Sequence, residues 1–303
     1  MKTIAKTPTE RVHGILSSHS PAIIVGNGIN KYTSPNKGDY GWDKLIESLW
    51  RGLSINAIPV GNDLSLTEAY DIINLSSEGE SELIDRVIRF VESIRPTAYQ
   101  GRLCQRMLER DLPVLTTNFD MLLEQGQTKR ILKHPDLLKQ GFTDYYPWNV
   151  YFGNTDLNNP IDGFGIWHIN GTVMYPRSMQ LGLTHYMNQV SRVRRFLHTG
   201  QITDDFEGKN QIMWKGFNTW LHIIFNCPLL ILGLGLDVNE TFLRWLLIER
   251  AKYFERFPSR RKAGWFLCQK DEISSGKVFF LQYLGIDTIM FDTFPELYES
   301  VLQ

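Results

Sequence analysis

The stretch Pro21-Ala22-Ile23-Ile24-Val25-Gly26-Asn27-Gly28-Ile29-Asn30 joins four apolar residues directly to a pair of glycines. A short run rich in Ile and Val is typical of a strand that is buried on both faces of a parallel sheet. At Gly26-Asn27-Gly28 the chain can adopt positive φ, and a ligand can approach the bare backbone. Ligands of open α/β sheets bind beyond the carboxyl ends of the strands, so we expect this loop and Asn30 to line a binding site.

The glycine pair does not complete the Gly-x-Gly-x-x-Gly pattern of a dinucleotide site, because Lys31 stands at the third position. From there we expect a polar loop up to Gly38, with the next helix beginning near Trp42. Taken alone, the pair fits an ordinary tight turn as well as a nucleotide site. The glycine pair becomes evidence for a binding site together with three later stretches that we expect to lie beside it in the fold.

A second apolar run, at residues 228–236, ends in the same way with Gly233 and Gly235. Asp237-Val238-Asn239-Glu240 follows and has the pattern of a helix N-terminus. Such an end carries a partial positive charge and suits a pyrophosphate. We therefore expect Gly233, Gly235, Asp237 and Asn239 to contribute to a nucleotide site.

The stretch Val114-Leu115-Thr116-Thr117-Asn118-Phe119-Asp120 changes from apolar to polar, as expected at the carboxyl end of a strand. Thr117, Asn118 and Asp120 would then lie at the same sheet edge as the glycine loops. Amide and carboxylate side chains there can hydrogen-bond ribose hydroxyls, a carboxamide or a water. The alternative for Asp120 is that it caps a helix, which we expect to resume at Met121. Capping would leave Asn118 unexplained.

Strand alternation returns in Gly165-Ile166-Trp167-His168-Ile169-Asn170-Gly171-Thr172-Val173. With a period of two, His168 and Asn170 share one face, and Trp167 and Ile169 share the other. A single histidine in a strand is usually a structural residue with satisfied hydrogen bonds. Beside Asn170 and a glycine, His168 becomes a candidate general base.

The order of the elements predicts the fold class. Apolar runs alternate with helical patterns, and two more runs at 265–268 and 288–291 add strands near the end of the chain. We predict an α/β, Rossmann-like fold with a mostly parallel sheet flanked by helices. Residues 64–94 read as two helices with no strand between them. They predict a helical insert or cap at about 54–97 within a single domain that covers 1–303.

Composition excludes several classes of function. The net charge of −1 provides no basic surface, so we expect no direct binding of nucleic acid. No apolar run is long enough to span a bilayer, and the first residues lack the apolar centre of a signal peptide, so we expect a cytoplasmic protein. Cys104, Cys227 and Cys268 form no Cys-x-x-Cys pair. They predict small core residues and no zinc ribbon.

In this order, the stretches resemble the sirtuin nucleotide-binding fold. The elements that carry the resemblance are Gly26-Asn27-Gly28-Ile29-Asn30, Thr117-Asn118-Phe119-Asp120, the strand from His168 to Gly171, and Leu232-Gly233-Leu234-Gly235-Leu236-Asp237. The chain looks like the sirtuin-like NAD hydrolases of bacterial antiphage defence more than the protein deacetylases, which usually carry a four-cysteine zinc ribbon. The resemblance covers residues 22–240, and Thr-Asn-Phe-Asp is its most specific element.

The resemblance implies NAD as the substrate and no metal. It places the Gly26-Asn27-Gly28 loop along the dinucleotide, Asn118 and Asp120 at the nicotinamide ribose, and the Gly233 to Gly235 loop at the adenosine half. In the cleavage that it implies, Asn118 orients a water or ribose hydroxyl, Asp120 offers negative charge, and His168 acts as general base.

One departure from the family leaves the catalytic position open. The family's His-Gly pair appears here as Asn170-Gly171, with His168 two residues earlier. Either His168 or Asn170 can therefore hold the catalytic position.

The predicted activity is hydrolysis of the nicotinamide–ribose bond to give nicotinamide and ADP-ribose, as an NAD-depleting effector of antiphage defence. The resemblance also implies a homo-oligomer and a regulatory partner, a ring-forming DNA-translocating ATPase. Two alternatives stay open: an NAD-dependent protein deacylase or ADP-ribosyltransferase, and a non-catalytic subunit that senses NAD or ADP-ribose.

Overall fold

The computed structural model describes residues 6–33, 40–51, 63–77, 79–125, 129–132, 143–198, 207–212 and 214–303. Within them, eight strands form one sheet in the order β3-β4-β5-β2-β1-β6-β7-β8. The strands from β5 to β8 in this order run parallel, and β4 and β3 continue the β5 edge in antiparallel fashion. The strands are β1 (Ala22–Val25), β2 (Val114–Thr116), β3 (Lys129–Leu132), β4 (Val150–Gly153), β5 (Ile166–His168), β6 (Leu229–Leu232), β7 (Gly264–Gln269) and β8 (Ile286–Phe291).

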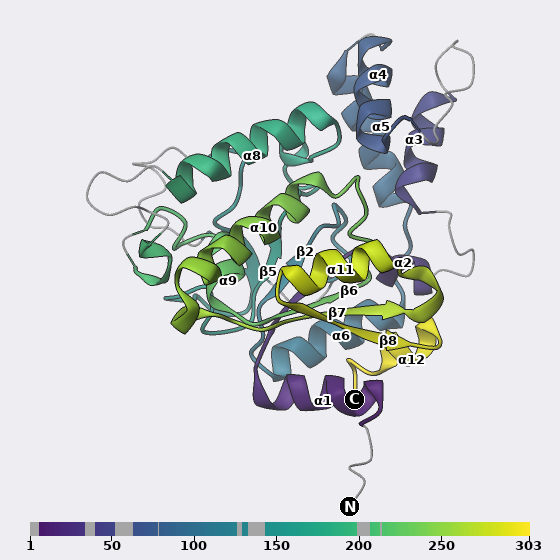
Figure 1. Ribbon diagram of the computed structural model, residues 1–303. Helices are drawn as coiled ribbons and strands as arrows, with labels where there is room; N and C mark the ends of the chain where they lie inside the picture. The colour runs from purple at the N-terminus through teal and green to yellow at the C-terminus, as the bar shows by residue number, and fades with distance from the viewer. Residues whose placement is uncertain are drawn as a thin grey trace, which may run out of the picture.

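Helices cover both faces of the sheet (Figure 1). One face carries α8, α9, α10 and α11, and the other carries α1, α6 and α12. The helices are α1 (Pro8–Ser18), α2 (Gly28–Thr33), α3 (Trp42–Trp50), α4 (Leu66–Leu75), α5 (Glu80–Glu92), α6 (Ala98–Glu109), α8 (Leu183–His198), α9 (Trp220–Asn226), α10 (Thr241–Arg256), α11 (Ser275–Tyr283) and α12 (Phe294–Glu299). None of these helices is long and apolar enough to cross a membrane.

Strand β1 shows why the sequence needs four apolar residues in a row. Ala22 and Ile24 belong to the core under α8–α11, while Ile23 and Val25 belong to the core under α1, α6 and α12. All four side chains are fully buried. The predicted strand with two buried faces is confirmed, and so is the Rossmann-like, mostly parallel α/β fold.

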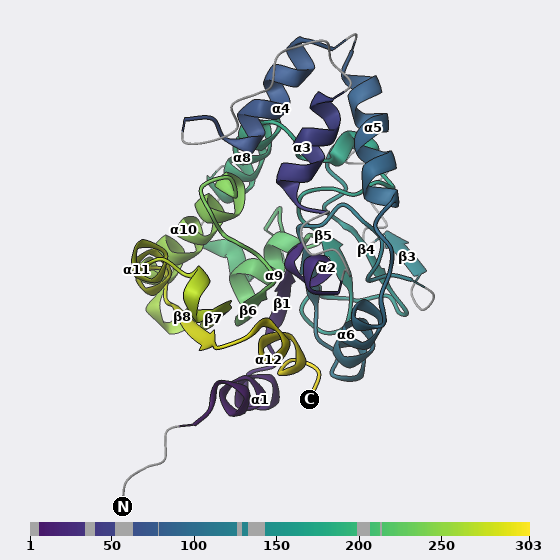
Figure 2. The ribbon, with the colours of Figure 1, turned by 90° about the vertical axis from the view of Figure 1, so that its right-hand side faces the viewer.

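Helices α3, α4 and α5 stand together beyond one end of the sheet (Figure 2). They share a third apolar core, in which Leu49, Ile73 and Val87 are fully buried. This helical group, which we call the cap, corresponds to the insert predicted at about 54–97. The shared core shows that the cap begins earlier, with α3.

Two loops differ from the sequence-based expectation at the carboxyl edge of the sheet. Helix α2 begins directly at Gly28, where a polar loop was expected, because the Asn27 carbonyl accepts hydrogen bonds from the amides of Asn30 and Lys31. Conversely, no helix resumes at Met121: residues 121–125 form bends and a turn. The Asp120 carboxylate accepts a hydrogen bond from the amide of Leu122 at 3.1 Å and turns the chain there.

Two further elements are shorter than predicted. β5 ends at His168, so the alternation expected up to Val173 stops before Asn170. Apolar residues at helical spacing over 211–225 predict a helix there, but α9 begins only after Thr219, whose hydroxyl accepts a hydrogen bond from the amide of Leu221. In both runs, some of the apolar residues are buried in loops and do not belong to a helix or a strand.

Candidate functional site

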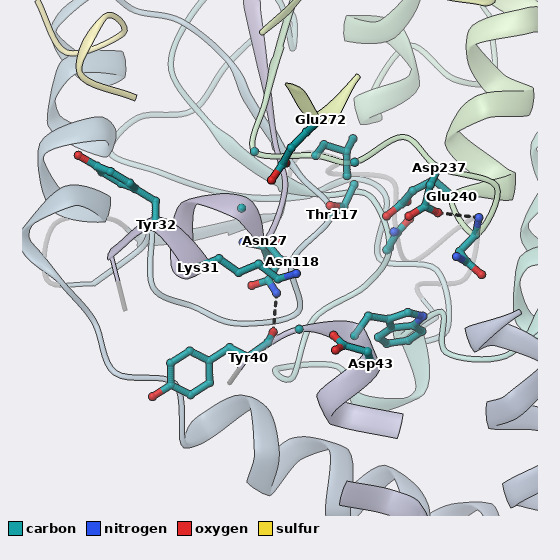
Figure 3. A pocket seen from close by; sticks show the side chains of 18 of the residues that line it. Asn27, Lys31, Tyr32, Tyr40, Asp43, Thr117, Asn118, Asp237, Glu240 and Glu272 are labelled. Atoms are coloured by element: carbon teal, nitrogen blue, oxygen red, sulfur yellow. Dashed lines mark hydrogen bonds between the residues drawn. The ribbon is translucent and has the colours of Figure 1, made fainter. Parts of the chain in front are cut away.

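A cavity of about 710 Å³ opens at the carboxyl ends of the central strands. β1 lies between β2 and β6, so the connections from β1 and β6 leave toward opposite sides. Open α/β sheets bind ligands at such a point. The loops after β1, β2, β5, β6 and β7 line the cavity together with α3 and α5 of the cap. Figure 3 shows Asn27 and Asn118 in the middle of the view, with Lys31 to one side and Asp237 and Glu240 to the other.

The two glycine loops pack against each other backbone to backbone. The amide of Gly28 donates to the carbonyl of Gly233 at 2.6 Å, and the amide of Gly26 donates to that of Leu232 at 3.1 Å. A Cβ at Gly26 would lie 2.5 Å from the Gly233 oxygen, and one at Gly28 would lie 2.7 Å from the same atom. Gly233 also has a φ of +64°, which favours glycine. These three glycines are therefore required by the close contact of the loops.

A buried polar network holds Asp120 at the cavity. The Asn30 amide donates to the Asp120 carboxylate at 2.8 Å and to the Asn27 side chain at 2.9 Å, and it accepts from Gln100 at 3.0 Å. Burial raises the pKa of Asp120 above its usual value, and the hydrogen bonds from Leu122 and Asn30 oppose that rise. Asp120 does not cap a helix, because none follows it. Of this network, Asn27 and Asp120 line the cavity and Asn30 supports them from behind.

Asn118 is the most unusual side chain of the site. It lines the cavity and is only 6% exposed. Its backbone is fixed, because its amide donates to the Thr116 hydroxyl at 3.1 Å. Neither the oxygen nor the nitrogen of its side-chain amide has a hydrogen-bond partner within the described residues. Unpaired buried polar atoms are costly, so this amide has the character of a group kept for a ligand.

His168 hydrogen-bonds the backbone of Asn118 from outside the cavity lining. Its Nδ1 lies 2.9 Å from the Asn118 carbonyl oxygen, which can only accept, so Nδ1 carries a proton. Its Nε2 lies 2.8 Å from Oε1 of buried Glu124. Burial alone would lower the pKa of His168, but the charge and hydrogen bond of Glu124 and the Asn118 carbonyl outweigh it and raise the pKa. His168 is not among the residues that line the cavity.

Asn170 does reach the cavity, although His168 does not. The shared face predicted for the two residues fails because β5 ends at His168 and the chain turns at Gly171, whose φ is +91°. Asn170 is 3% exposed and its side-chain oxygen has no partner within the described residues. Its nitrogen lies 3.5 Å from the hydroxyl of Tyr186, a buried residue of α8 that also lines the cavity.

The loop from β6 to α10 forms the acidic side of the cavity. Asp237 accepts the amide of Asn239 at 2.8 Å, so it closes a turn and does not cap α10. Glu240 occupies the N-cap position without a side-chain capping bond, and its Oε2 is buried without a partner within the described residues. Burial and the charge of Asp237 raise the pKa of Glu240 to about 7. Two carboxylates at this helix end oppose the pyrophosphate that was expected there.

Most of the residues predicted for the site meet at this one cavity. Those that line it are Asn27, Gly28, Thr117, Asn118, Asp120, Asn170, Gly233, Gly235, Asp237 and Asn239. Gly26, Asn30 and His168 lie behind the lining. The sequence missed Tyr186, Glu124 and the role of Glu240. Glu240 carried no distinct signal, because three residues after Asp237 it fits the glutamate of a capping box.

No protein-family model matches the chain, and no match was found among curated proteins. Among the residues that the structure describes, no group of three His, Cys, Asp or Glu side chains is placed to hold a metal ion. The three cysteines are free and buried, and Cys268 reaches the cavity. Burial raises the pKa of its thiol to about 11, which keeps it protonated and unreactive at neutral pH.

Proposed function

We propose that this chain binds NAD in the cavity at the sheet edge and hydrolyses the bond between nicotinamide and ribose. The observation that carries the proposal is the unpartnered amide of Asn118 beside the Asn30-bound carboxylate of Asp120. Both lie in a cavity large enough for a nucleotide, beside the two glycine loops that pack against each other. The resemblance of these stretches to sirtuin-like NAD hydrolases adds the identity of the substrate.

The chemistry requires few groups. When the C1′–N1 bond breaks, its electron pair neutralises the nicotinamide ring and leaves an oxocarbenium-like ribose. Fixed dipoles and charges near that ribose lower the barrier because they need no reorganisation during the reaction. Asn118 would hold a ribose hydroxyl or the attacking water, and Asp120 would face the developing positive charge. His168 and Asn30 would keep these two groups in position.

One observation favours a second candidate, a non-catalytic sensor of NAD or ADP-ribose. The residue predicted as general base, His168, has both ring nitrogens engaged and lies outside the cavity lining. A sensor would need the glycine loops and the cavity but no base. The choice between the two functions therefore depends on whether another group in the cavity can accept a proton.

The test is incubation of the purified chain with NAD, followed by chromatography of nicotinamide and ADP-ribose. Equal amounts of the two products support hydrolysis, whereas nicotinamide without ADP-ribose would indicate transfer of ADP-ribose to an acceptor. Tight binding in a calorimeter with no nicotinamide at any protein concentration would contradict the proposal and favour the sensor.

We further propose that assembly controls the activity, because an unrestrained NAD hydrolase would deplete its own cell. Self-association and a ring-forming DNA-translocating ATPase are the controls that the family resemblance suggests. Light scattering and the NAD assay are therefore to be run together, with and without the ATPase. A monomer that is fully active alone would contradict this part of the proposal.

A further inference from the structure

The loop from β6 to α10 ends in a glutamate whose side chain makes no capping hydrogen bond. Glu240 is the N-cap residue of α10, a position that serine, threonine, aspartate or asparagine usually fills by accepting an amide of the first turn. Its side chain makes no such bond. Its Oε2 is buried and has no partner within the described residues. A carboxylate oxygen left in this state destabilises the fold, which indicates a role outside folding.

The surroundings of Glu240 indicate that role. Glu240 lines the same cavity as Asn118 and Asn170, which are 6% and 3% exposed and also carry side-chain atoms without partners. Figure 3 shows Glu240 beside Asp237, across the cavity from Lys31. Three side chains from separate elements thus present unsatisfied polar atoms to one space. Tyr186 connects two of them, because its hydroxyl lies 3.5 Å from the Asn170 nitrogen and the charge of Glu240 acts on it. A water bound on this side of the cavity can hydrogen-bond a carboxylate oxygen such as that of Glu240.

We propose that Glu240 is the general base of this site and activates the water that attacks C1′ of the nicotinamide ribose. This inference rests on the proposed function. The C1′–N1 bond breaks with its electron pair passing to the ring nitrogen, and nicotinamide leaves as a neutral molecule. A bond forms between the water oxygen and C1′, and the Glu240 carboxylate accepts the water proton. The proton then passes to solvent, so NAD and water yield ADP-ribose, nicotinamide and one proton.

The charges around Glu240 suit a base that works near neutral pH. Burial, and after it the charge of Asp237 on the same loop, raise the pKa of Glu240 to about 7, the range in which a general base is most effective. From α8, Tyr186 faces this group; burial first, and then the charges of Glu240 and Asp237, raise the pKa of its phenol well above the usual value. Arg244, one turn along α10 from Glu240, donates a hydrogen bond to the carbonyl of Leu236 at 2.7 Å.

The pH dependence of NAD cleavage tests the proposal. The base works when ionised, so we expect the rate of the wild-type chain to rise with pH through about 7 and then level off. Glu240→Gln is expected to lower the plateau by about 10²-fold or more, to remove the rise, and to change KM for NAD little. Asp237→Asn is expected to move the rise to lower pH, because it removes the charge that raises the pKa of Glu240.

Glu255→Gln is the matched control, since Glu255 is an exposed residue of the same helix outside the cavity. It is expected to keep the wild-type rate and profile. A Glu240→Gln variant that cleaves NAD at the wild-type rate with the same pH profile would overturn this inference and leave the proposed function standing. If Glu240→Gln does not fold, an unmoved profile in Asp237→Asn would overturn it. A wild-type chain that releases no nicotinamide would overturn both.

Discussion

The two walls of the cavity contain the same Gly-x-Gly motif but differ in how their polar groups are satisfied. The first wall consists of the loops after β1 and β2, and the second wall is the loop from β6 to α10. In the first wall, Asn30 joins Asn27, Gln100 and Asp120 in one buried network. In the second wall, Gly235 is exposed and Glu240 keeps a buried oxygen without a partner within the described residues.

The first wall is rigid, whereas the second wall contains a strained residue. Close backbone contact at Gly26, Gly28 and Gly233 joins the two walls, and the first wall is also held by the buried His168–Glu124 pair. The second wall contains Leu236 at a φ of +46°, an unfavourable conformation for a non-glycine residue, held by Arg244 and Lys277 on neighbouring carbonyls. Substitutions of the packed glycines and of the hydrogen-bonded network are therefore expected to affect stability. Substitutions of Asn118 and Glu240, whose side chains carry polar atoms without partners within the described residues, are expected to affect activity.

The largest loss of stability is expected from His168→Ala beneath the first wall. The change removes the buried 2.8 Å hydrogen bond between His168 Nε2 and Glu124 Oε1 together with the positive charge beside that carboxylate, which costs about 3–5 kcal/mol of unfolding free energy. Urea unfolding at neutral pH measures this loss. Lys44→Ala removes an exposed ion pair with Glu47 and serves as the control, with a much smaller expected loss. Equal losses in the two variants would contradict the assigned role of His168.

The same variant is expected to change how the free energy of unfolding depends on pH. Because the folded pKa of His168 is raised, its protonation stabilises the fold fully below the unfolded pKa of about 6.5, and this contribution is lost as pH rises through the folded pKa. His168→Ala should abolish that part of the slope of stability against pH. An unchanged slope would indicate that the folded histidine is neutral.

A substitution at the contact of the glycine loops is expected to have the next largest effect. In Gly26→Ala, the new Cβ would lie 2.5 Å from the Gly233 oxygen and 2.9 Å from the Leu234 Cα, both backbone atoms that cannot give way cheaply. We expect a loss of about 3 kcal/mol. Thermal unfolding checks the value, and a loss below 1 kcal/mol would show that the two loops can separate.

Glu240→Gln is expected to stabilise the protein at pH 8. Folded Glu240 keeps its proton up to about pH 7, whereas the unfolded side chain ionises near 4.5, so its contribution to stability is full below pH 4.5 and falls between these values. Glutamine removes this loss. Because the side chain is partly open to the cavity, we expect a gain of about 1–2 kcal/mol at pH 8 and none at pH 4. A variant that is less stable at pH 8 would contradict the account of the second wall.

The smallest effect is expected at the other end of the same motif. A Cβ at Gly235 meets only the Asp237 carboxylate at 3.6 Å, an ordinary contact, and Gly235 is exposed. Gly235→Ala should change the unfolding free energy by less than about 0.5 kcal/mol. Compared with Gly26→Ala by the same measurement, it tests the contrast between the walls with one type of substitution. Similar losses in both would remove that contrast.

Local patterns predicted β1, β2 and β6 because each carries its own signal of burial, whereas no strand was predicted at β3. The run Ala22–Val25 is apolar at every position, and the structure buries every position. The start of α10 was harder to predict. Asp237 has the composition of an N-cap, but it closes its own turn with Asn239, and the helix begins later. Short-range hydrogen bonds of this kind compete with helix capping and leave little trace in the sequence.

The sequence predicted which residues lie at the strand ends of the candidate site, but it did not predict what each residue does there. Asn118 and Asp120 follow a strand, and parallel strands bring such residues to one edge. The difference between His168 and Asn170 depends on where β5 stops, on the turn at Gly171, and on the hydrogen bond between His168 and Glu124. Glu124 lies 44 residues from His168 in the chain, so no local pattern connects the two.

The most direct test of the central claim is the rate of nicotinamide release from NAD by Asn118→Ala relative to the wild-type chain. The side-chain amide of Asn118 makes no hydrogen bond within the described residues, so its loss should leave the melting temperature nearly unchanged. The account predicts that release falls by at least about 10²-fold. Asn188→Ala, an exposed position on α8 outside the cavity, should keep the wild-type rate. Wild-type release by a folded Asn118→Ala variant would contradict the claim that this amide is kept for NAD.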